Sequence, residues 1–238
     1  MGTLTGRAVM LTGASRGLGR ALALAAAREG AALAICARGG DALEAVAEAC
    51  RAEGADVVAV LADVSDARDV ERFAATALER FGGIDILINN AAALGPTPTP
   101  QLTDAPPSAL EEVLRANVIG PLRLTQAVIG GMLLRNQGLV LNLTSDASII
   151  GYAGLGIYSA SKAALDALTR SWAAELQHTS VRVISVDPGD MNTVMHFAAD
   201  PEADPAELLR PEDVAERILV LLAGRLPAAD RVEAATLE

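Results

Sequence analysis

Arg7-Ala8-Val9-Met10-Leu11-Thr12-Gly13-Ala14-Ser15-Arg16-Gly17-Leu18-Gly19 is the stretch of this chain that decides its fold. Its first half is a short apolar run, which predicts a buried β-strand, and the Ala- and Leu-rich residues that follow it predict a helix. The three glycines allow a tight turn, close approach of the backbone to a pyrophosphate, and close packing of the helix on the strand. The first turn of that helix presents free N–H groups to an anion. The turn is therefore predicted to bind the phosphates of a dinucleotide, through Gly13, Ser15, Arg16, Gly17, Leu18 and Gly19.

The rest of the chain repeats this alternation of apolar strands and amphipathic helices. Strands are predicted at 7–12, 31–36, 56–61, 84–89, 138–144 and 181–186, and helices at 17–29, 41–53, 67–81, 108–135, 156–177 and 211–223. Such alternation predicts an α/β fold: a single Rossmann-fold domain over residues 1–238, with a doubly wound parallel sheet of six or seven strands and helices on both faces. Asp41 and Glu44 are predicted to form a capping box at the start of the second helix.

Two irregular segments interrupt the alternation. Residues 94–107 are rich in proline and cannot form regular structure, and residues 190–210 are rich in proline and aspartate. They follow the fourth and sixth predicted strands. Because ligands bind beyond the carboxyl ends of the strands in an open parallel sheet, both segments are predicted to form walls of a substrate site.

Composition excludes several classes of protein. With 51% hydrophobic and 21% charged residues, the chain is predicted to be globular, and its net charge of −11 argues against nucleic-acid and anionic-membrane partners. No apolar run reaches the roughly 18–20 residues of a membrane span, and the N-terminal residues leave no room for a signal peptide. Two cysteines and two histidines, without ligand spacing, predict no metal site. A reducing, cytoplasmic setting is expected.

Tyr158 and Lys162 stand one turn apart on one face of the helix predicted at 156–177. A phenol has a pKa of about 10 and is a poor acid or base near neutrality. An ammonium one turn away favours the phenolate and is expected to lower that pKa. Ser145, at the end of the strand predicted at 138–144, is expected to hold the oxygen on which the tyrosine acts. For the Tyr/Lys spacing alone, an ordinary structural pair remains the alternative.

Arg38 bears on the choice between the two nicotinamide cofactors. The end of the second predicted strand, Ile35-Cys36-Ala37-Arg38-Gly39, has no carboxylate to bind the 2′-hydroxyl of an adenine ribose. Arg38, helped by Arg16, can instead form charge-assisted hydrogen bonds with a 2′-phosphate. NADP(H) is therefore predicted in preference to NAD(H). The alternative is a solvated Arg38, or one paired with Asp41.

From the Gly-rich turn to Thr193, the chain resembles the short-chain dehydrogenase/reductase family in its single-domain branch. The resemblance rests on the Gly-rich turn, on Asn89-Asn90-Ala91-Ala92, on Asn142-Leu143-Thr144-Ser145, on the Tyr/Lys pair and on Pro188-Gly189-Asp190-Met191-Asn192-Thr193. Ala92 replaces the family's usual glycine. The C-terminal residues 231–238 depart from the family's glycine-rich ending, which leaves open whether a last strand forms.

The resemblance assigns roles to further residues. It implies that Ser145, Tyr158, Lys162 and Asn117 are catalytic, with Asn117 holding a water that connects the lysine to solvent. It also implies cofactor contacts by Asp63, Val64, Asn90, Ala91, Tyr158, Lys162, Pro188, Gly189, Met191 and Thr193.

The activity implied is hydride transfer between nicotinamide and a small-molecule carbonyl or alcohol substrate, with Tyr158 as acid or base. Family members pair the long helices near 108–135 and 156–177, so a homodimer or homotetramer is expected. Two alternatives remain: an NAD-dependent alcohol dehydrogenase of the same family, and a non-catalytic NADP(H)-binding sensor.

Overall fold

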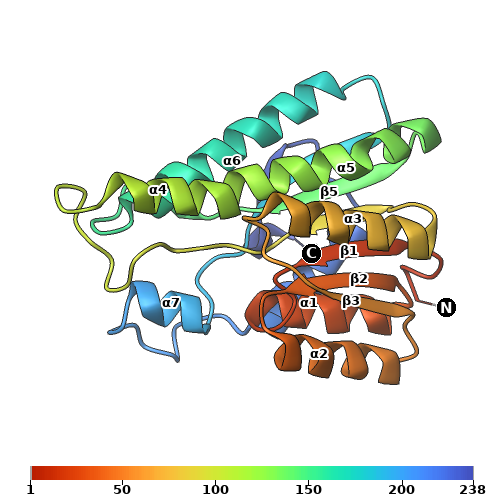
Figure 1. Ribbon diagram of the computed structural model, residues 1–238, viewed down its shortest axis with the longest axis horizontal. Helices are drawn as coiled ribbons and strands as arrows, with labels where there is room; N and C mark the ends of the chain where they lie inside the picture. The colour runs from red at the N-terminus through yellow and green to blue at the C-terminus, as the bar shows by residue number, and fades with distance from the viewer. Residues whose placement is uncertain (1, 238) are drawn as a thin grey trace.

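Seven parallel strands form a single sheet in the computed structural model, which describes residues 2–237 (Figure 1). The strands are β1 (Ala8–Thr12), β2 (Ala32–Ala37), β3 (Val57–Leu61), β4 (Ile86–Asn89), β5 (Gly138–Leu143), β6 (Val181–Asp187) and β7 (Arg231–Glu233). Their order across the sheet is β3-β2-β1-β4-β5-β6-β7. The direction of winding therefore reverses between β3 and β4, and the crevice beyond the adjacent ends of β1 and β4 is where such sheets bind ligands.

Helices cover both faces of this sheet (Figure 1). One core lies between the sheet and α1 (Gly17–Arg28), α2 (Gly40–Ala52) and α8 (Pro211–Leu222). The other lies between the sheet and α3 (Ala67–Phe81), α5 (Gly120–Arg135) and α6 (Gly156–Glu175). Two shorter helices, α4 (Pro107–Leu114) and α7 (Val194–Ala199), stand beyond one end of the strands (Figure 1). The predicted fold class is confirmed.

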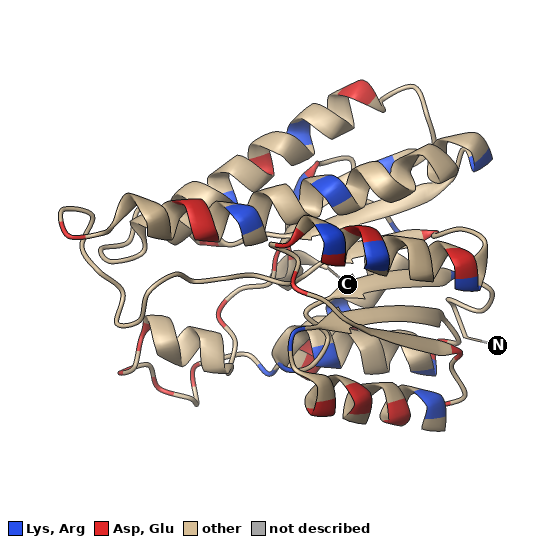
Figure 2. Ribbon diagram, in the orientation of Figure 1, with Lys and Arg blue, Asp and Glu red and all other residues tan. Residues whose placement is uncertain are grey.

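The strands pack on both faces because their side chains alternate in direction. In β1, Val9 and Leu11 contribute to the core under α1, whereas Ala8 and Met10 contribute to the core under α3 and α5. Strands β1 to β5 contain no charged residue, and Figure 2 shows the Lys, Arg, Asp and Glu residues mainly on the helices and loops. This is the pattern expected of strands buried on both sides.

The structure adds detail that the sequence left open and corrects one prediction. A seventh strand forms, because β7 pairs in parallel with β6. The helix predicted at 108–135 is interrupted by a π-helical turn, η1 (Arg115–Ile119), between α4 and α5. The predicted capping box is wrong: α2 begins after Gly39 without a side-chain cap, and the Glu44 carboxylate instead lies 2.6 Å from Arg51.

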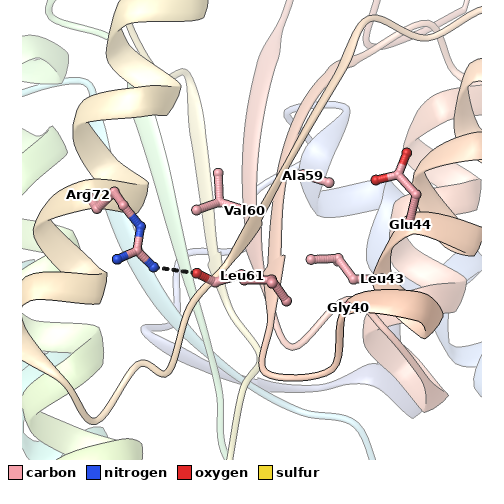
Figure 3. A pocket seen from close by; sticks show the side chains of 7 residues that line it. All are labelled: Gly40, Leu43, Glu44, Ala59, Val60, Leu61 and Arg72. Atoms are coloured by element: carbon pink, nitrogen blue, oxygen red, sulfur yellow. Dashed lines mark hydrogen bonds between the residues drawn. The ribbon is translucent and has the colours of Figure 1, made fainter.

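The outer edge of β3 is flanked by a shallow hollow between α2 and α3 (Figure 3). Arg72 of α3 donates to the carbonyl of Leu61 there, and Arg51 donates to the carbonyl of Val57 at the other end of the strand. Two arginines thus occupy carbonyls that an edge strand would otherwise offer to another chain. None of the predicted site residues lines this hollow.

Candidate active site

The Gly-rich turn between β1 and α1 is held from the end of β4. The side chain of Asn90 donates to the carbonyls of Thr12 and Gly13, at 2.9 and 3.2 Å, and the Thr12 hydroxyl accepts from the N–H groups of Asn90 and Ala91. Gly13 has a φ of +68°, and a Cβ there would lie 2.9 Å from the Cα of Ala91. Only glycine fits this backbone without strain.

The same turn fits the phosphates of a dinucleotide. Arg16 precedes α1 without a side-chain cap, so the N–H groups of the first helical turn carry no side-chain acceptor. A hollow of about 360 Å³ opens beside Gly17 and is walled on its other side by Asn192 and Arg210. The methyl group of Thr193 would lie 3.4 Å from a Cβ at Gly17. The segment after β6 therefore packs against the Gly-rich turn, as a binding site shared by both would require.

Arg16 and Arg38 are both exposed, beyond the carboxyl ends of the neighbouring strands β1 and β2. Within residues 2–237 neither forms an ion pair, so the alternative pairing of Arg38 with Asp41 does not occur. Asp63, after β3, accepts from the N–H and hydroxyl of Ser65 at 2.9 and 2.7 Å, and Val64 is buried beside it. The Oδ1 of Asp63 thus stabilises the turn formed by residues 63–65.

Ser145, Tyr158 and Lys162 meet beyond the ends of β5 and β6. Tyr158 lies in the first turn of α6 and is partly exposed. Lys162, one turn later, is buried; its Nζ donates to the carbonyl of Leu143 at 2.6 Å and lies 5.6 Å from the centre of the Tyr158 ring. The Ser145 hydroxyl donates to Asp146 at 2.9 Å, accepts from the N–H of Ala147, and lies close enough to Tyr158 to lower the pKa of its phenol.

The electrostatics of this group differ from the prediction made for it. Removal from water raises the pKa of Tyr158, the nearby Asp187 and Asp146 raise it further, and only the neighbouring Ser145 hydroxyl lowers it. Burial lowers the pKa of Lys162 to about 8, against the opposing effect of Asp166 and Asp187. The expected lowering of the tyrosine pKa by Lys162 is therefore not what this structure shows: burial and Asp187 dominate, and the ammonium donates to the carbonyl of Leu143 instead.

Asn117 lies in the π-helical turn and its side-chain amide is fully used. Its oxygen accepts from the N–H of Ala93 at 2.7 Å, and its nitrogen donates to the Ala93 carbonyl and to the Ser161 hydroxyl at 2.8 and 2.9 Å. Ser161 in turn donates to the carbonyl of Tyr158 at 2.7 Å. The asparagine thus connects the segment after β4 to the turn of α6 that carries Tyr158.

The segment after β6 closes the site on its remaining side. Gly189, at a φ of +76°, follows Pro188, and its N–H donates to Asp187 at 3.1 Å. Met191 forms an isolated parallel bridge with Leu209, which fixes the two ends of the segment that carries α7. Thr193 caps α7 by accepting from the N–H of His196 at 3.2 Å.

Sequence reasoning missed four charged residues around this group. Asp146, Asp166, Asp187 and Arg231 lie among or behind the predicted residues. Asp166 could have been predicted from the sequence, because it lies one helical turn after Lys162, as Lys162 lies one turn after Tyr158. Arg231 could not have been predicted, because its position depends on the pairing of β7 with β6. No group of three or more His, Cys, Asp or Glu residues within 2–237 has the arrangement of a metal site.

The sheet order, the glycine-rich turn and the crevice between β1 and β4, where the direction of winding changes, define a protein of the Rossmann-fold class. Residues 7–204 match the model of the family described as short chain dehydrogenase. The chain therefore belongs to the short-chain dehydrogenase family, whose matching members are oxidoreductases.

Individual relatives agree with this assignment. The chain is 36% identical to a 3-oxoacyl-[acyl-carrier-protein] reductase of Synechocystis, covering 93% of this chain and 91% of that one. It is 37% identical to a glycine betaine reductase of Emericella nidulans, but spans only 18% of that protein's length. An alcohol dehydrogenase of Thermococcus sibiricus, solved with 5-hydroxy-NADP, superposes with a TM-score of 0.84 at 33% identity, over 95% of each chain.

Among residues 2–237, no helix combines the length and apolar character needed to cross a membrane.

Proposed function

We propose that this protein is an NADP(H)-dependent oxidoreductase that transfers a hydride between nicotinamide and a small carbonyl or alcohol substrate, with Tyr158 as acid and base. The observation that carries the proposal is the grouping of a partly exposed phenol, a serine hydroxyl beside it and a buried ammonium. They stand beyond the carboxyl ends of the parallel strands, on the same side of the sheet as the Gly-rich turn that follows β1. A non-catalytic sensor would have no need of this grouping.

The chemistry of the proposal divides between the cofactor and this chain's residues. Bound NADP(H) supplies or accepts the hydride. In the reductive direction Tyr158 donates its proton to the substrate oxygen, and Ser145 donates a hydrogen bond to the same oxygen and orients it. Lys162 stabilises the phenolate that remains and binds the ribose hydroxyls of the cofactor. In the oxidative direction the same residues take the proton back.

Asn117 fits a proton relay through its backbone rather than through its side chain. In a regular helix the N–H of residue 121 donates to the carbonyl of Asn117, and in a π-helix it donates to the carbonyl of Ala116. Residue 121 is a proline and has no N–H to donate. A carbonyl in this turn is therefore left without its regular donor, and such a group binds water. We propose that this water connects Lys162 to solvent.

Arg38 supports the choice of NADP(H), because it is exposed beyond β2 and has no carboxylate partner within residues 2–237. Replacing it (Arg38→Glu) is expected to raise the dissociation constant of NADPH about 10²-fold, since charge-assisted bonds are lost and repulsion of the 2′-phosphate is added. NADH has no such phosphate, so its constant is expected to change far less. Fluorescence titration with both cofactors measures the ratio.

The control is Arg225→Glu, the same charge change in the loop that enters β7 from the amino end of the strand. It is expected to leave both constants unchanged. If Arg38→Glu leaves the NADPH/NADH ratio where it was, Arg38 does not select the cofactor. The NAD-dependent alternative would then be favoured.

A screen of NADPH oxidation against aldehydes, ketones and 3-oxoacyl esters tests the activity itself. Exposed apolar side chains stand on the segments around the site, including Ile149, Ile150 and Met195. They favour a mainly apolar substrate, and the similarity to a 3-oxoacyl reductase makes 3-oxoacyl esters the first class to test. NADPH binding without turnover of any substrate in the panel would support the sensor instead.

We further propose a homodimer or homotetramer in the cytoplasm. Leu133 and Leu134 of α5 are 40% and 92% exposed, and such side chains gain by burial against a second copy. Leu134→Glu is therefore expected to shift the sedimentation velocity profile toward the monomer. Leu61→Glu, at a 54% exposed leucine of the sheet edge, is the control and is expected to change nothing. A wild-type protein that sediments as a monomer at all concentrations would contradict the proposal.

The cysteines are compatible with a reducing compartment. Cys36 and Cys50 are free and buried, and burial raises their pKa values to about 12 and about 11, so neither is a reactive thiolate.

A further inference from the structure

Arg231 joins three elements that carry the candidate site. It stands on β7, and its side chain donates to Asp187 at the end of β6, at 3.0 Å, and to the carbonyl of Ser145 after β5, at 3.3 Å. Its Nε lies 3.5 Å from the carboxylate of Asp166 on α6. Asp166 also accepts from the hydroxyl of Ser148 at 2.6 Å, in the turn that follows Ser145.

The partners of Arg231 are more deeply buried than Arg231 itself. The side chains of Asp166 and Asp187 are 5% and 8% exposed, against 22% for Arg231. Two carboxylates in such surroundings need compensating positive charge. Arg231 and the buried Lys162 are the cations that meet this need: both carboxylates act on Lys162, and Arg231 contacts both carboxylates.

The two cations and two carboxylates of this group compensate one another's charge, but they do not satisfy all of one another's hydrogen bonds. The Nε of Arg231 and the Oδ1 of Asp166 both lack a hydrogen-bond partner within residues 2–237. A purely structural arginine would be expected to satisfy its donors. An arginine whose main effect is its positive charge need not do so.

We propose that Arg231 is a positioning residue for the reaction: it fixes the carbonyl of Ser145 and cancels negative charge that would otherwise act on Tyr158 and Lys162. The proposal rests on the proposed function, in which Tyr158 exchanges a proton with the substrate. It gives the C-terminal strand a role in the chemistry, although Arg231 itself is not assigned a contact with substrate.

The direction of the effect follows from every charged group near Tyr158. Asp146 after β5 and Asp187 on β6 act on Tyr158 itself, and Lys162 and Asp166 on α6 and Arg231 on β7 lie next to them. Removing the arginine makes this set more negative by one charge. Both Tyr158 and Lys162 then hold their protons more tightly, so the first proton to leave either group is lost at higher pH.

Protonation of Asp187 does not cancel this shift. Burial already raises the pKa of Asp187, and Arg231 opposes that rise, so without the arginine this carboxyl would keep its proton to higher pH. The shift concerns the alkaline range in which a phenol and an amine lose protons, and there Asp187 is again a carboxylate.

The test is the pH profile of kcat/KM in the oxidative direction, where activity rises as the Tyr158–Lys162 pair loses a proton. For Arg231→Gln the midpoint of this rise is expected to move up by about one pH unit. Arg231→Lys keeps the charge and is expected to keep the midpoint, with a lower kcat because the bond to the Ser145 carbonyl is lost. Arg231→Gln combined with Asp166→Asn restores the balance and is expected to return the midpoint toward the wild-type value.

Arg182→Gln is the matched control, because Arg182 also stands at the β6–β7 boundary and bonds to the Pro227 carbonyl without contacting Asp166 or Asp187. It is expected to leave the midpoint unchanged. An unshifted midpoint in Arg231→Gln, or a shift equally large in Arg182→Gln, overturns the proposal. If Arg231→Gln fails to fold, Asp166→Asn alone decides: it removes one of the negative charges that Arg231 balances and is expected to lower the midpoint, and an unshifted midpoint overturns the proposal.

A second readout does not depend on turnover. The chain has two tyrosines, so Tyr152→Phe leaves Tyr158 as the only one. Tyrosinate absorbance of the NADP⁺-loaded protein then reports Tyr158 directly, and at a fixed alkaline pH Arg231→Gln is expected to show less tyrosinate than its parent. Equal absorbance in the two proteins contradicts the proposal. A wild-type protein without any NADP(H)-linked turnover would contradict the proposed function, whatever the Arg231 variants show.

Discussion

Tyr158→Phe is expected to lower kcat by about 10³-fold, while the dissociation constant of NADPH stays close to that of the wild type. The variant removes one oxygen, and with it the proton that the substrate oxygen would receive. Ser145 keeps its bonds to Asp146 and to the N–H of Ala147, so the turn that carries it is not left unsupported. Single-turnover kinetics with preloaded NADPH measure the loss at the chemical step.

The natural control is the other tyrosine. Tyr152→Phe also removes one phenol oxygen next to Asp146, to which Tyr152 donates, but Tyr152 is more exposed and Lys162 is not one turn away from it. It is expected to keep most of the wild-type kcat. Should Tyr158→Phe lose NADPH binding together with activity, the hydroxyl is needed for the fold of the site and its proposed role in proton transfer is wrong.

Features that depend on neighbouring residues could be predicted from the sequence. The Gly-rich turn, the parallel order of strand and helix, and the Tyr/Lys spacing are local, because backbone conformation and helical periodicity determine them. The structure accordingly brings Ser145, Tyr158 and Lys162 together, and Thr193 lies against the Gly-rich turn.

Features that depend on distant partners could not be predicted. The π-helical turn at Arg115–Ile119 lies inside a run that has the periodicity of one helix, and the bonds of Asn117 to Ala93 and Ser161 are visible only in three dimensions. The capping box failed because Gly39, two residues before Asp41, is the N-cap, so Asp41 lies inside the first turn of the helix. The rise in the Tyr158 pKa comes from burial and from Asp187, neither of which the Tyr/Lys spacing reveals.

Gly19→Ala is expected to disrupt the cofactor site more than any other single methyl group added to the Gly-rich turn. A Cβ at this position would lie 2.1 Å from the carbonyl oxygen of Gly13 and 2.5 Å from the Asn90 side-chain nitrogen that bonds to that same carbonyl. These atoms cannot move independently, because Asn90 ties the turn to β4. Overpacking of this kind costs about 1–3 kcal/mol.

If that cost falls on the conformation that binds phosphate, the dissociation constant of NADPH is expected to rise about tenfold or more. Thermal unfolding without cofactor and NADPH titration separate the effect on stability from the effect on binding. Gly130→Ala is the matched control, since Gly130 also lies inside a helix and a Cβ there has no atom within 4 Å. It is expected to bind NADPH normally and to be slightly more stable, because alanine favours a helix. Normal NADPH binding by Gly19→Ala would mean that the turn does not need this close contact, and the predicted role of Gly19 in the phosphate site would then be wrong.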